Sequence, residues 1–147
     1  MKKVKFTIFK IQRRGEGERY EKFQSLENRR LLFHGSAMTN MLGILSQGIR
    51  IAPPEAPTTG YMFGKGAYFA DLFKKSANYS HSGHKTRLML ICEVALGKMM
   101  ERYTDWVELK LPANYNSVKA IGYLGGNFKD KAIVTPEGYQ VPFGAEI

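Results

Sequence analysis

The clearest periodic pattern in the chain lies at residues 38–47, where apolar side chains recur on one face of a helix. The recurring positions, spaced as i, i+3, i+4 and i+7, are Met38, Met41, Leu42 and Leu45. Ser36 or Thr39 is expected to cap the start of this helix, and Gly48 stands where a helix-ending glycine belongs. The pattern predicts an amphipathic helix with one apolar stripe.

Three other stretches are typical of strands. Residues 88–96 form a nearly continuous apolar run, which predicts a central strand buried on both faces. Residues 30–34 predict a short buried strand. Residues 3–12 alternate loosely between apolar and polar side chains, which also predicts a strand.

The remaining elements are shorter. In chain order we expect a turn at 13–18, a helix at 20–28, an irregular proline-rich loop at 51–60, a strand at 67–70, a helix at 72–79, and strands within 99–103 and 132–142. No repeat or low-complexity tract divides the chain. The sequence therefore predicts one α+β domain over residues 1–147, with mixed or antiparallel sheets and few short helices.

The composition is ordinary for a globular chain, with 44% hydrophobic and 24% charged residues. No apolar run approaches the roughly 20 residues that a membrane-spanning helix needs, and the first residues lack the apolar core of a signal peptide. We therefore expect no membrane segment and no leader. The single cysteine, Cys92, excludes a disulfide within the chain and is expected to act as a small buried hydrophobe.

The net charge of +9 favours an anionic partner, whether a nucleic acid, an acidic protein or a phosphate-bearing molecule. The basic residues are dispersed, and their densest stretch comprises Lys2, Lys3, Lys5, Lys10, Arg13 and Arg14. This stretch is interpreted as a solvated face in preference to a docking patch. A nucleic-acid-binding domain stays the weakest hypothesis, because the chain has neither a binding motif of that class nor a clustered basic helix.

Common phosphate and metal motifs are absent from the sequence. The run 64–66 ends like a P-loop, but Thr59 stands where the first glycine is needed and Gly66 where a Ser or Thr is needed. No GxGxxG follows a strand. His81 and His84 flank a glycine without a cysteine pair or a nearby carboxylate, so we expect a solvated loop and no metal site.

Two clusters have residues suited to binding a polar ligand. His34, Gly35 and Ser36 place an imidazole, an unshielded backbone and a hydroxyl between a strand and a helix N-terminus, an arrangement that suits an amide or sugar hydroxyls. A core histidine satisfied by backbone groups explains His34 equally well.

The second cluster consists of aromatic and hydroxyl side chains near glycine-rich turns. Its members are Tyr61, Tyr68, Ser76 and Tyr79. They suit either ordinary packing or a slot for a planar ring.

These same residues lie in runs that closely resemble the catalytic domain of poly(ADP-ribose) polymerases. The runs are RRLLFHGS at 29–36, GILSQGIRIAPPEAP at 43–57, TGYMFGKGAYFAD at 59–71, KSANY at 75–79 and EVALG at 93–97, with weaker matches at 116–119 and 141–142. The resemblance extends from about residue 7 to residue 144. It implies the ADP-ribosyltransferase fold.

The resemblance also implies a role for each matched residue in binding NAD. His34 matches a histidine that holds the adenosine ribose, and Gly35 and Ser76 match residues that bind the nicotinamide amide. Tyr79 matches a tyrosine that stacks on the nicotinamide ring, while Tyr68, followed by Phe69, matches the second member of a His-Tyr-Glu triad. The remaining matches are Ser36, Gly43 and Arg50 at the adenosine end, Tyr61 in the pocket, and Lys65 near the reacting centre.

The third member of the triad has no clear match. In the family this glutamate lies on a strand near the C-terminus, in a pattern like Asn-Glu-Tyr-Ile-Val-Tyr. Glu146 lacks those flanking residues and is expected to precede that strand. We therefore expect the last strands of the fold to be missing from this sequence and a C-terminal segment to complete it.

The function implied by the resemblance is transfer of ADP-ribose from NAD to acceptor protein side chains, with release of nicotinamide. It implies no metal, no direct contact with DNA, and an intracellular, nuclear location. The alternative is a weakly active or inactive module that binds NAD or ADP-ribose, since the triad glutamate is not identified.

Overall fold

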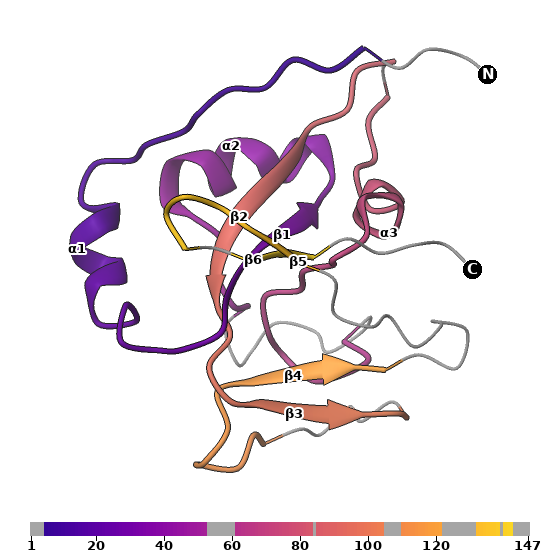
Figure 1. Ribbon diagram of the computed structural model, residues 1–147. Coiled ribbons are helices and arrows are strands. Elements are labelled where there is room, and N and C mark those ends of the chain that lie inside the picture. Colours follow the sequence, from indigo (N-terminus) through magenta and orange to yellow (C-terminus); the bar gives the residue numbers. More distant parts are fainter. Residues whose placement is uncertain are drawn as a thin grey trace.

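The computed structural model describes residues 5–52, 61–83, 85–104, 110–121, 132–138 and 140–142 (Figure 1). These residues form helices and strands in the order α1 (Glu16–Glu21), β1 (Arg29–Gly35), α2 (Met38–Gln47), α3 (Phe73–Ala77), β2 (Met89–Ala95), β3 (Met99–Arg102), β4 (Ser117–Ala120), β5 (Ala132–Val134) and β6 (Gln140–Pro142). The predicted α+β class with few short helices is confirmed.

Strand β1 is the centre of the larger sheet, whose order is β2-β1-β6-β5. Along one edge it pairs antiparallel with β2, from Arg29 opposite Ala95 to Gly35 opposite Met89. Along the other edge it pairs parallel with β6 at Arg30, and β6 forms an antiparallel pair with β5. The second sheet is the parallel pair β3-β4, drawn below the larger sheet in Figure 1. The larger sheet is therefore mixed and the smaller one parallel.

The apolar run at 88–96 forms β2, but the expectation of a central strand buried on both faces is wrong. Within the described residues β2 lies at an edge of the sheet, and Ile91 and Leu88 are 56% and 41% exposed. Hydrophobicity alone does not determine strand order. The central place belongs to β1, in which Leu32 is buried.

Helix α2 begins and ends where the periodicity predicts, and Gly48 follows it with a φ of 90°, a backbone conformation that favours glycine. The capping prediction is wrong: neither Ser36 nor Thr39 is the N-cap, a position that Ala37 occupies without a side-chain bond. A distant backbone group replaces the cap, because the amide of Met38 donates to the carbonyl of His81 at 2.9 Å.

The apolar stripe of α2 is only partly buried. Met41 is 2% exposed, whereas Leu42 is 80% and Leu45 37% exposed. The periodicity identified the helix correctly but not the width of its buried face. Only a narrow line of the helix packs on the described core.

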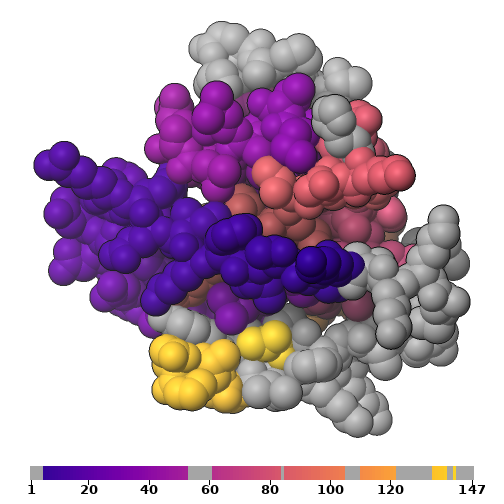
Figure 2. All heavy atoms as spheres, turned by 90° about the horizontal axis from the view of Figure 1, so that it is seen from above, coloured from indigo at the N-terminus to yellow at the C-terminus, as the bar shows by residue number. Residues whose placement is uncertain are grey.

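The strand expected at 3–12 is wrong over its described part, residues 5–12, which have no regular structure. This segment crosses the surface (Figure 2), and Ile8 and Phe9 are 83% and 77% exposed. One side chain anchors it: the ring of Phe6 packs edge-on against Phe73 at 5.7 Å, and Phe73 packs in the same way against Phe33 at 5.8 Å. The alternation predicted a strand, but among the described residues this segment pairs with no neighbouring strand.

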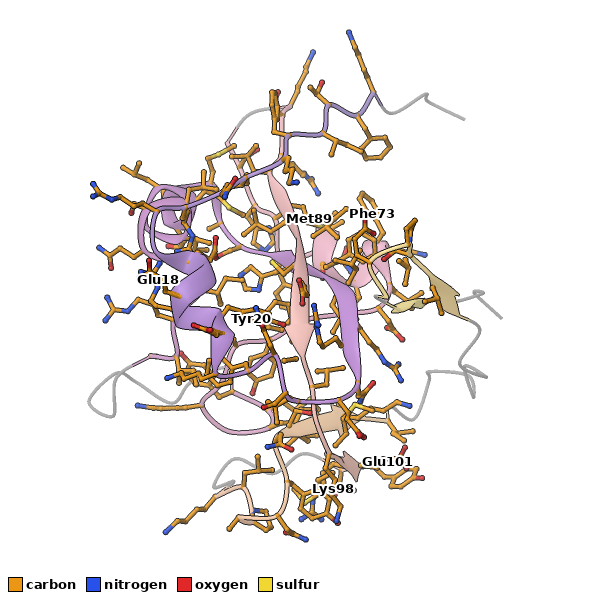
Figure 3. All side chains as sticks on the ribbon, turned by 60° about the vertical axis from the view of Figure 1, so that its left-hand side comes forward. Glu18, Tyr20, Phe73, Met89, Lys98 and Glu101 are labelled. Carbon is orange, nitrogen blue, oxygen red and sulfur yellow. The ribbon has the colours of Figure 1, made fainter. Side chains whose placement is uncertain are left out.

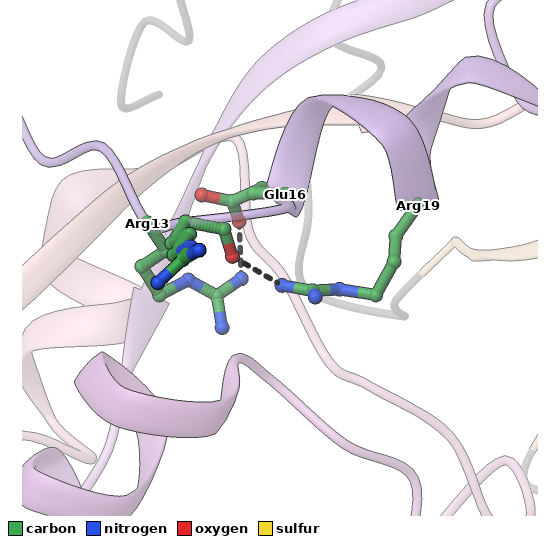
Figure 4. Close-up of polar contacts among 4 residues, drawn as sticks. Arg13, Glu16 and Arg19 are labelled. Carbon is green, nitrogen blue, oxygen red and sulfur yellow. Dashed lines mark hydrogen bonds and ion pairs between the residues drawn. The ribbon is translucent and has the colours of Figure 1, made fainter.

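The turn expected at 13–18 is confirmed only at Arg14 and Gly15, because helix α1 occupies 16–18, and α1 overlaps the helix expected at 20–28 only at Tyr20 and Glu21. The helix begins after Gly15, and two glutamates in its first turn interact favourably with the positive end of the helix dipole. Glu16 pairs with Arg13, and Arg19 donates to the carbonyl of Arg14 at 3.5 Å (Figure 4). The arginine beside Glu16 lowers the pKa of that carboxyl group.

A polar cluster fastens α1 to the sheet. The hydroxyl of Tyr20 donates to Glu93 of β2 at 3.0 Å, and Nε of Arg29 donates to the same carboxylate oxygen at 2.7 Å. Figure 3 shows Tyr20 pointing from α1 toward β2. Burial, followed by the bond to Glu93, raises the pKa of Tyr20 to about 12.

The shorter elements agree in part with prediction. The strand expected at 67–70 is wrong and is reduced to one bridge, Phe33 opposite Ala70, while the helix expected at 72–79 is confirmed as the shorter α3. Strand β3 confirms the prediction for 99–103, and β5 and β6 confirm strands within 132–142. Residues 53–60 of the expected loop lie outside the described residues. No helix in the described part has the length and apolar character that a membrane crossing requires.

Candidate functional site

Three segments that are distant in sequence meet at the C-terminal end of β1. Phe33 exchanges two backbone bonds with Ala70, at 2.8 and 2.9 Å, and the hydroxyl of Ser76 in α3 donates to the carbonyl of Phe33 at 2.9 Å. The end of β1 therefore joins the segment before α3 to α3 itself. Two of the predicted clusters, the one at His34 and the one at Tyr68, share this junction.

His34 is half-buried and held by a backbone group of the second cluster. Its Nδ1 lies 2.8 Å from the carbonyl oxygen of Tyr68, and its ring lies 5.6 Å from the ring of Phe69. Because a carbonyl oxygen only accepts hydrogen bonds, Nδ1 must carry the proton of a neutral His34. Nε2 is then an acceptor, suited to a hydroxyl donor on a ligand.

Gly35 packs directly against the backbone of α3. A Cβ atom at this position would lie 2.8 Å from the carbonyl carbon of Ser76, closer still to its oxygen, and 2.9 Å from Oγ of Ser80. Only glycine fits this approach.

The backbone of Gly35 also faces the site. Backbone groups of successive strand residues point to opposite edges, so the N–H and C=O of Gly35 point to the same edge as those of Phe33, away from β2. Those two groups are suited to a ligand amide, which both donates and accepts.

Tyr68 uses its hydroxyl to close a turn of its own chain. The hydroxyl donates to the carbonyl of Gly64 at 2.6 Å and accepts from the amide of Phe63 at 3.1 Å. Its ring lies 6.2 Å from that of Tyr61, with the two planes tilted by 41°. The structure therefore brings these two tyrosines together, and the 40% exposure of Tyr68 leaves ring surface open to a ligand.

Ser76 and Tyr79 lie at the end of α3. Ser76 is buried, and the donation to Phe33 uses its only hydroxyl proton, which leaves Oγ as an acceptor. The amide of Tyr79 donates to the carbonyl of Ser76 at 3.0 Å, and its side chain is 60% exposed. An exposed tyrosine thus stands beside a buried serine and the backbone of Gly35.

The residues predicted for the other end of the ligand are more dispersed. Ser36 accepts from the amide side chain of Asn40 at 3.0 Å, and Arg50 donates to Gln47 at 2.8 Å. Gly43 faces open space on α2, and Lys65 is half-buried in the turn that Tyr68 closes. Within the described residues no hydrogen bond or ion pair joins Gly43 or Arg50 to His34.

Two further predictions concern metal and nucleophilic groups. His81 lines a shallow open hollow of about 190 Å³ beside the start of α2, and among the described residues no three His, Cys, Asp or Glu side chains gather as a metal site. His84 and Glu146 lie outside the described residues. Cys92 is half-buried, and burial raises the pKa of its thiol to about 11, which disfavours a thiolate nucleophile.

Two residues that contact the site were not predicted. Asn40 stands four residues after Ser36, a spacing that places both on one side of the start of α2, so this contact was detectable from the sequence. Ser80 is buried against Gly35 and Ser76. Only its place next to Tyr79 could have indicated it.

The chain matches known proteins over nearly its whole length. The family model described as "Poly(ADP-ribose) polymerase catalytic domain" matches residues 2–147. The chain is 53% identical over 140 residues to poly [ADP-ribose] polymerase 2-A of Oryza sativa subsp. japonica, a match that covers 93% of this chain and 21% of that protein.

Two animal relatives give similar values. The chain is 54% identical over 139 residues to poly [ADP-ribose] polymerase 1 of Xenopus laevis, with 93% of this chain and 14% of that protein covered. It is 51% identical over 142 residues to poly [ADP-ribose] polymerase of Sarcophaga peregrina, with 95% of this chain and 14% of that protein covered. The chain thus spans about a fifth or less of the length of these curated relatives.

Proposed function

The chain belongs to the poly(ADP-ribose) polymerase catalytic domain family, and we propose that it is an NAD-dependent ADP-ribosyltransferase core that transfers ADP-ribose to protein side chains and releases nicotinamide. The observation that carries this proposal is the junction at the end of β1. There the Nδ1 of His34 bonds the carbonyl of Tyr68, the hydroxyl of the buried Ser76 bonds the carbonyl of Phe33, and the backbone of Gly35 packs directly against that of Ser76.

The amide of nicotinamide is assigned to Gly35 and Ser76. Its NH₂ group donates to the carbonyl of Gly35 and to Oγ of Ser76, which is already committed as a donor to Phe33. Its carbonyl accepts from the N–H of Gly35. A side chain at residue 35 would displace α3 from β1 and so disturb this recognition.

The nicotinamide ring is assigned to the exposed tyrosines. Tyr79 offers an exposed ring beside Ser76, and Tyr68 offers a second ring that the turn at 63–64 holds in place. Tyr61 packs beside Tyr68 and so supports this pair, while Phe69 packs beside His34. Aromatic side chains in such positions orient a flat ring through stacking.

His34 is assigned to a ribose hydroxyl of the adenosine half. With its proton on Nδ1, the ring can accept a hydrogen bond from the ribose hydroxyl at Nε2. Ser36 before α2, Gly43 within it and Arg50 after it are proposed to line the adenosine end. Lys65 is proposed to stand near the reacting centre.

The chemistry demands orientation and charge stabilisation. Breaking the bond between nicotinamide and ribose develops positive charge on the sugar, as in glycoside hydrolysis, and the quaternary nitrogen already activates nicotinamide as a leaving group. The bonding pair leaves with nicotinamide, an acceptor side chain attacks the sugar carbon, and the acceptor loses a proton. A metal is not required for this step, while a carboxylate beside the sugar would contribute several kcal/mol.

Release of nicotinamide from NAD, measured together with NAD binding, tests the proposal. We expect wild type to bind NAD and to release nicotinamide only slowly, since no triad carboxylate is assigned, and His34→Ala to lose most of both. Binding without release would favour the alternative of an NAD-binding or ADP-ribose-binding module. That alternative is supported by the fact that no residue is assigned as the triad carboxylate. Absence of binding by the wild-type chain would overturn both readings. Nuclear localisation is part of the same proposal, and imaging of a tagged chain tests it.

A further inference from the structure

Ser80 is a buried polar residue with no role in the function proposed above. In the described part of the chain the buried polar side chains are Ser76, at 4% exposure, and Ser80, at 2%. A hydroxyl at this depth needs a hydrogen-bond partner, since a buried polar group without one is costly. The partner of Ser80 is therefore informative.

Ser80 donates to the carbonyl oxygen of Ser76, at 3.4 Å. The same oxygen accepts from the amide of Tyr79 at 3.0 Å, and the amide of Ser80 donates to Ala77 at 3.1 Å. The carbonyl of Ser76 is thus held from two directions at the point where it meets Gly35.

Ser80 also lies close to Gly35, on the side of that residue that faces α3. A Cβ on Gly35 would lie 2.9 Å from Oγ of Ser80, so a side chain at residue 35 would clash with the Ser80 hydroxyl as well as with the Ser76 carbonyl. The next residue, His81, accepts from the amide of Met38 at 2.9 Å. Ser80 therefore lies where the end of α3 and the start of α2 are joined.

We propose that Ser80 is a positioning residue for the carboxamide end of the nicotinamide pocket. Its hydroxyl fixes the Ser76 carbonyl beneath Gly35, and through that contact it sets the backbone of Gly35, the hydroxyl of Ser76 and the ring of Tyr79. This inference rests on the proposed function. The hydrogen bonds that Ser80 donates go to Ser76 and Ala77 of α3, on the nicotinamide side, so we expect its effect to be confined to nicotinamide.

The test measures binding of two separate probes, nicotinamide and ADP-ribose, by titration calorimetry of the full chain. Ser80→Ala removes one hydrogen bond, and we expect it to weaken nicotinamide binding roughly threefold to tenfold. We expect ADP-ribose binding to stay within about twofold of wild type, a change that corresponds to less than 0.5 kcal/mol.

A conservative variant and a remote variant complete the design. Ser80→Cys keeps a donor, and its larger sulfur suits the long spacing of 3.4 Å, so we expect it to retain nicotinamide binding. The matched control is Ser117→Ala, which also removes a serine hydroxyl bonded to a carbonyl, that of Leu96 at 2.7 Å. Leu96 follows the end of β2 opposite to the one that pairs with Gly35, and we expect no change in either affinity.

Each result decides the inference. Selective loss of nicotinamide binding in Ser80→Ala, with recovery in Ser80→Cys, supports it. Equal loss for both probes, an unchanged nicotinamide affinity, or the same loss in Ser117→Ala overturns it. If Ser80→Ala fails to fold, the ratio of the two affinities in Ser80→Cys decides, and a nicotinamide-selective loss there contradicts the inference. A wild-type chain that binds neither probe refutes the proposed function itself, so the two failures are distinguishable.

Discussion

Gly35→Ala is the most informative single change, because it adds one methyl group at the closest backbone contact of the site. The added Cβ would lie 2.8 Å from the carbonyl carbon of Ser76 and 2.9 Å from Oγ of Ser80. The first of these atoms belongs to the backbone, which is fixed by hydrogen bonds from Tyr79 and Ser80. Relief therefore requires α3 to move away from β1.

The energetic cost follows from that movement. Overpacking in a tight core costs about 1–3 kcal/mol, and loss of the bond from Ser76 to Phe33 adds about 1 kcal/mol. A loss of about 2–4 kcal/mol is a large share of the roughly 5–15 kcal/mol that stabilises a domain. With a conversion of about 4 °C per kcal/mol, the melting temperature falls by about 8–16 °C.

Thermal unfolding followed by circular dichroism measures this loss, and nicotinamide titration below the transition measures the effect on the site. Gly17→Ala is the matched control, because Gly17 lies in α1 with nothing within 4 Å of the added Cβ. We expect that control to melt at or slightly above wild type. If Gly35→Ala has the same melting temperature as wild type and binds nicotinamide equally well, the close approach of β1 and α3 is refuted.

Three further predictions concern other parts of the structure. Tyr68→Phe leaves the amide of Phe63 and the carbonyl of Gly64 without their hydrogen-bond partner. We therefore expect faster amide hydrogen exchange at residues 61–68 and a loss of about 1 kcal/mol in the free energy of unfolding. An unchanged exchange rate would contradict this. The pKa of Tyr20 is raised from 10.0 to about 12, so its contribution to stability is complete below about pH 10 and is lost as the pH rises toward about 12. The decline of the free energy of unfolding over this pH range should be shallower in Tyr20→Phe than in wild type. An identical decline in both would count against the Glu93 contact. Burial raises the pKa of Cys92 from 9.0 to about 11. Its thiol should therefore react with a disulfide reagent at pH 8 roughly 100-fold more slowly in the folded chain than in the denatured chain. Equal reaction rates in the two states would contradict the burial of this thiol.

The sequence was most reliable where a pattern is local. Helix α2 has the predicted bounds because its periodicity and its terminal Gly48 act within a few residues. Its N-cap was missed because the partner of the Met38 amide is the carbonyl of His81, more than 40 residues away in the chain.

Predictions that depend on a distant partner were wrong more often. The alternation at residues 5–12 implies an extended backbone, but a strand also needs a neighbour, which no local pattern encodes. The apolar run of β2 was placed at the centre of the sheet on composition alone, whereas pairing puts β1 there. Helix α1 was missed because its stability comes from charges and from the contact of Tyr20 with Glu93.

The candidate site shows the same division. Residue types identified His34, Gly35, Ser76 and the tyrosines, and the structure brings most of them to one end of β1. The bond from His34 goes to a backbone carbonyl, which any residue at 68 would provide, so side-chain identity gave no indication of it. The depth of Ser80 depends on the packing of α3 against β1 and was equally hidden.

The central claim, that the end of β1 binds NAD, is tested most directly by assigning the backbone amide resonances of the chain and titrating it with NAD. We expect the largest shifts at Gly35 and Ser36, at residues 68–70 and at residues 76–80. We expect small shifts in α1 and in the β3-β4 pair, where no site residue lies. Shifts confined to those two regions, with none at Gly35 and Ser76, would contradict the account.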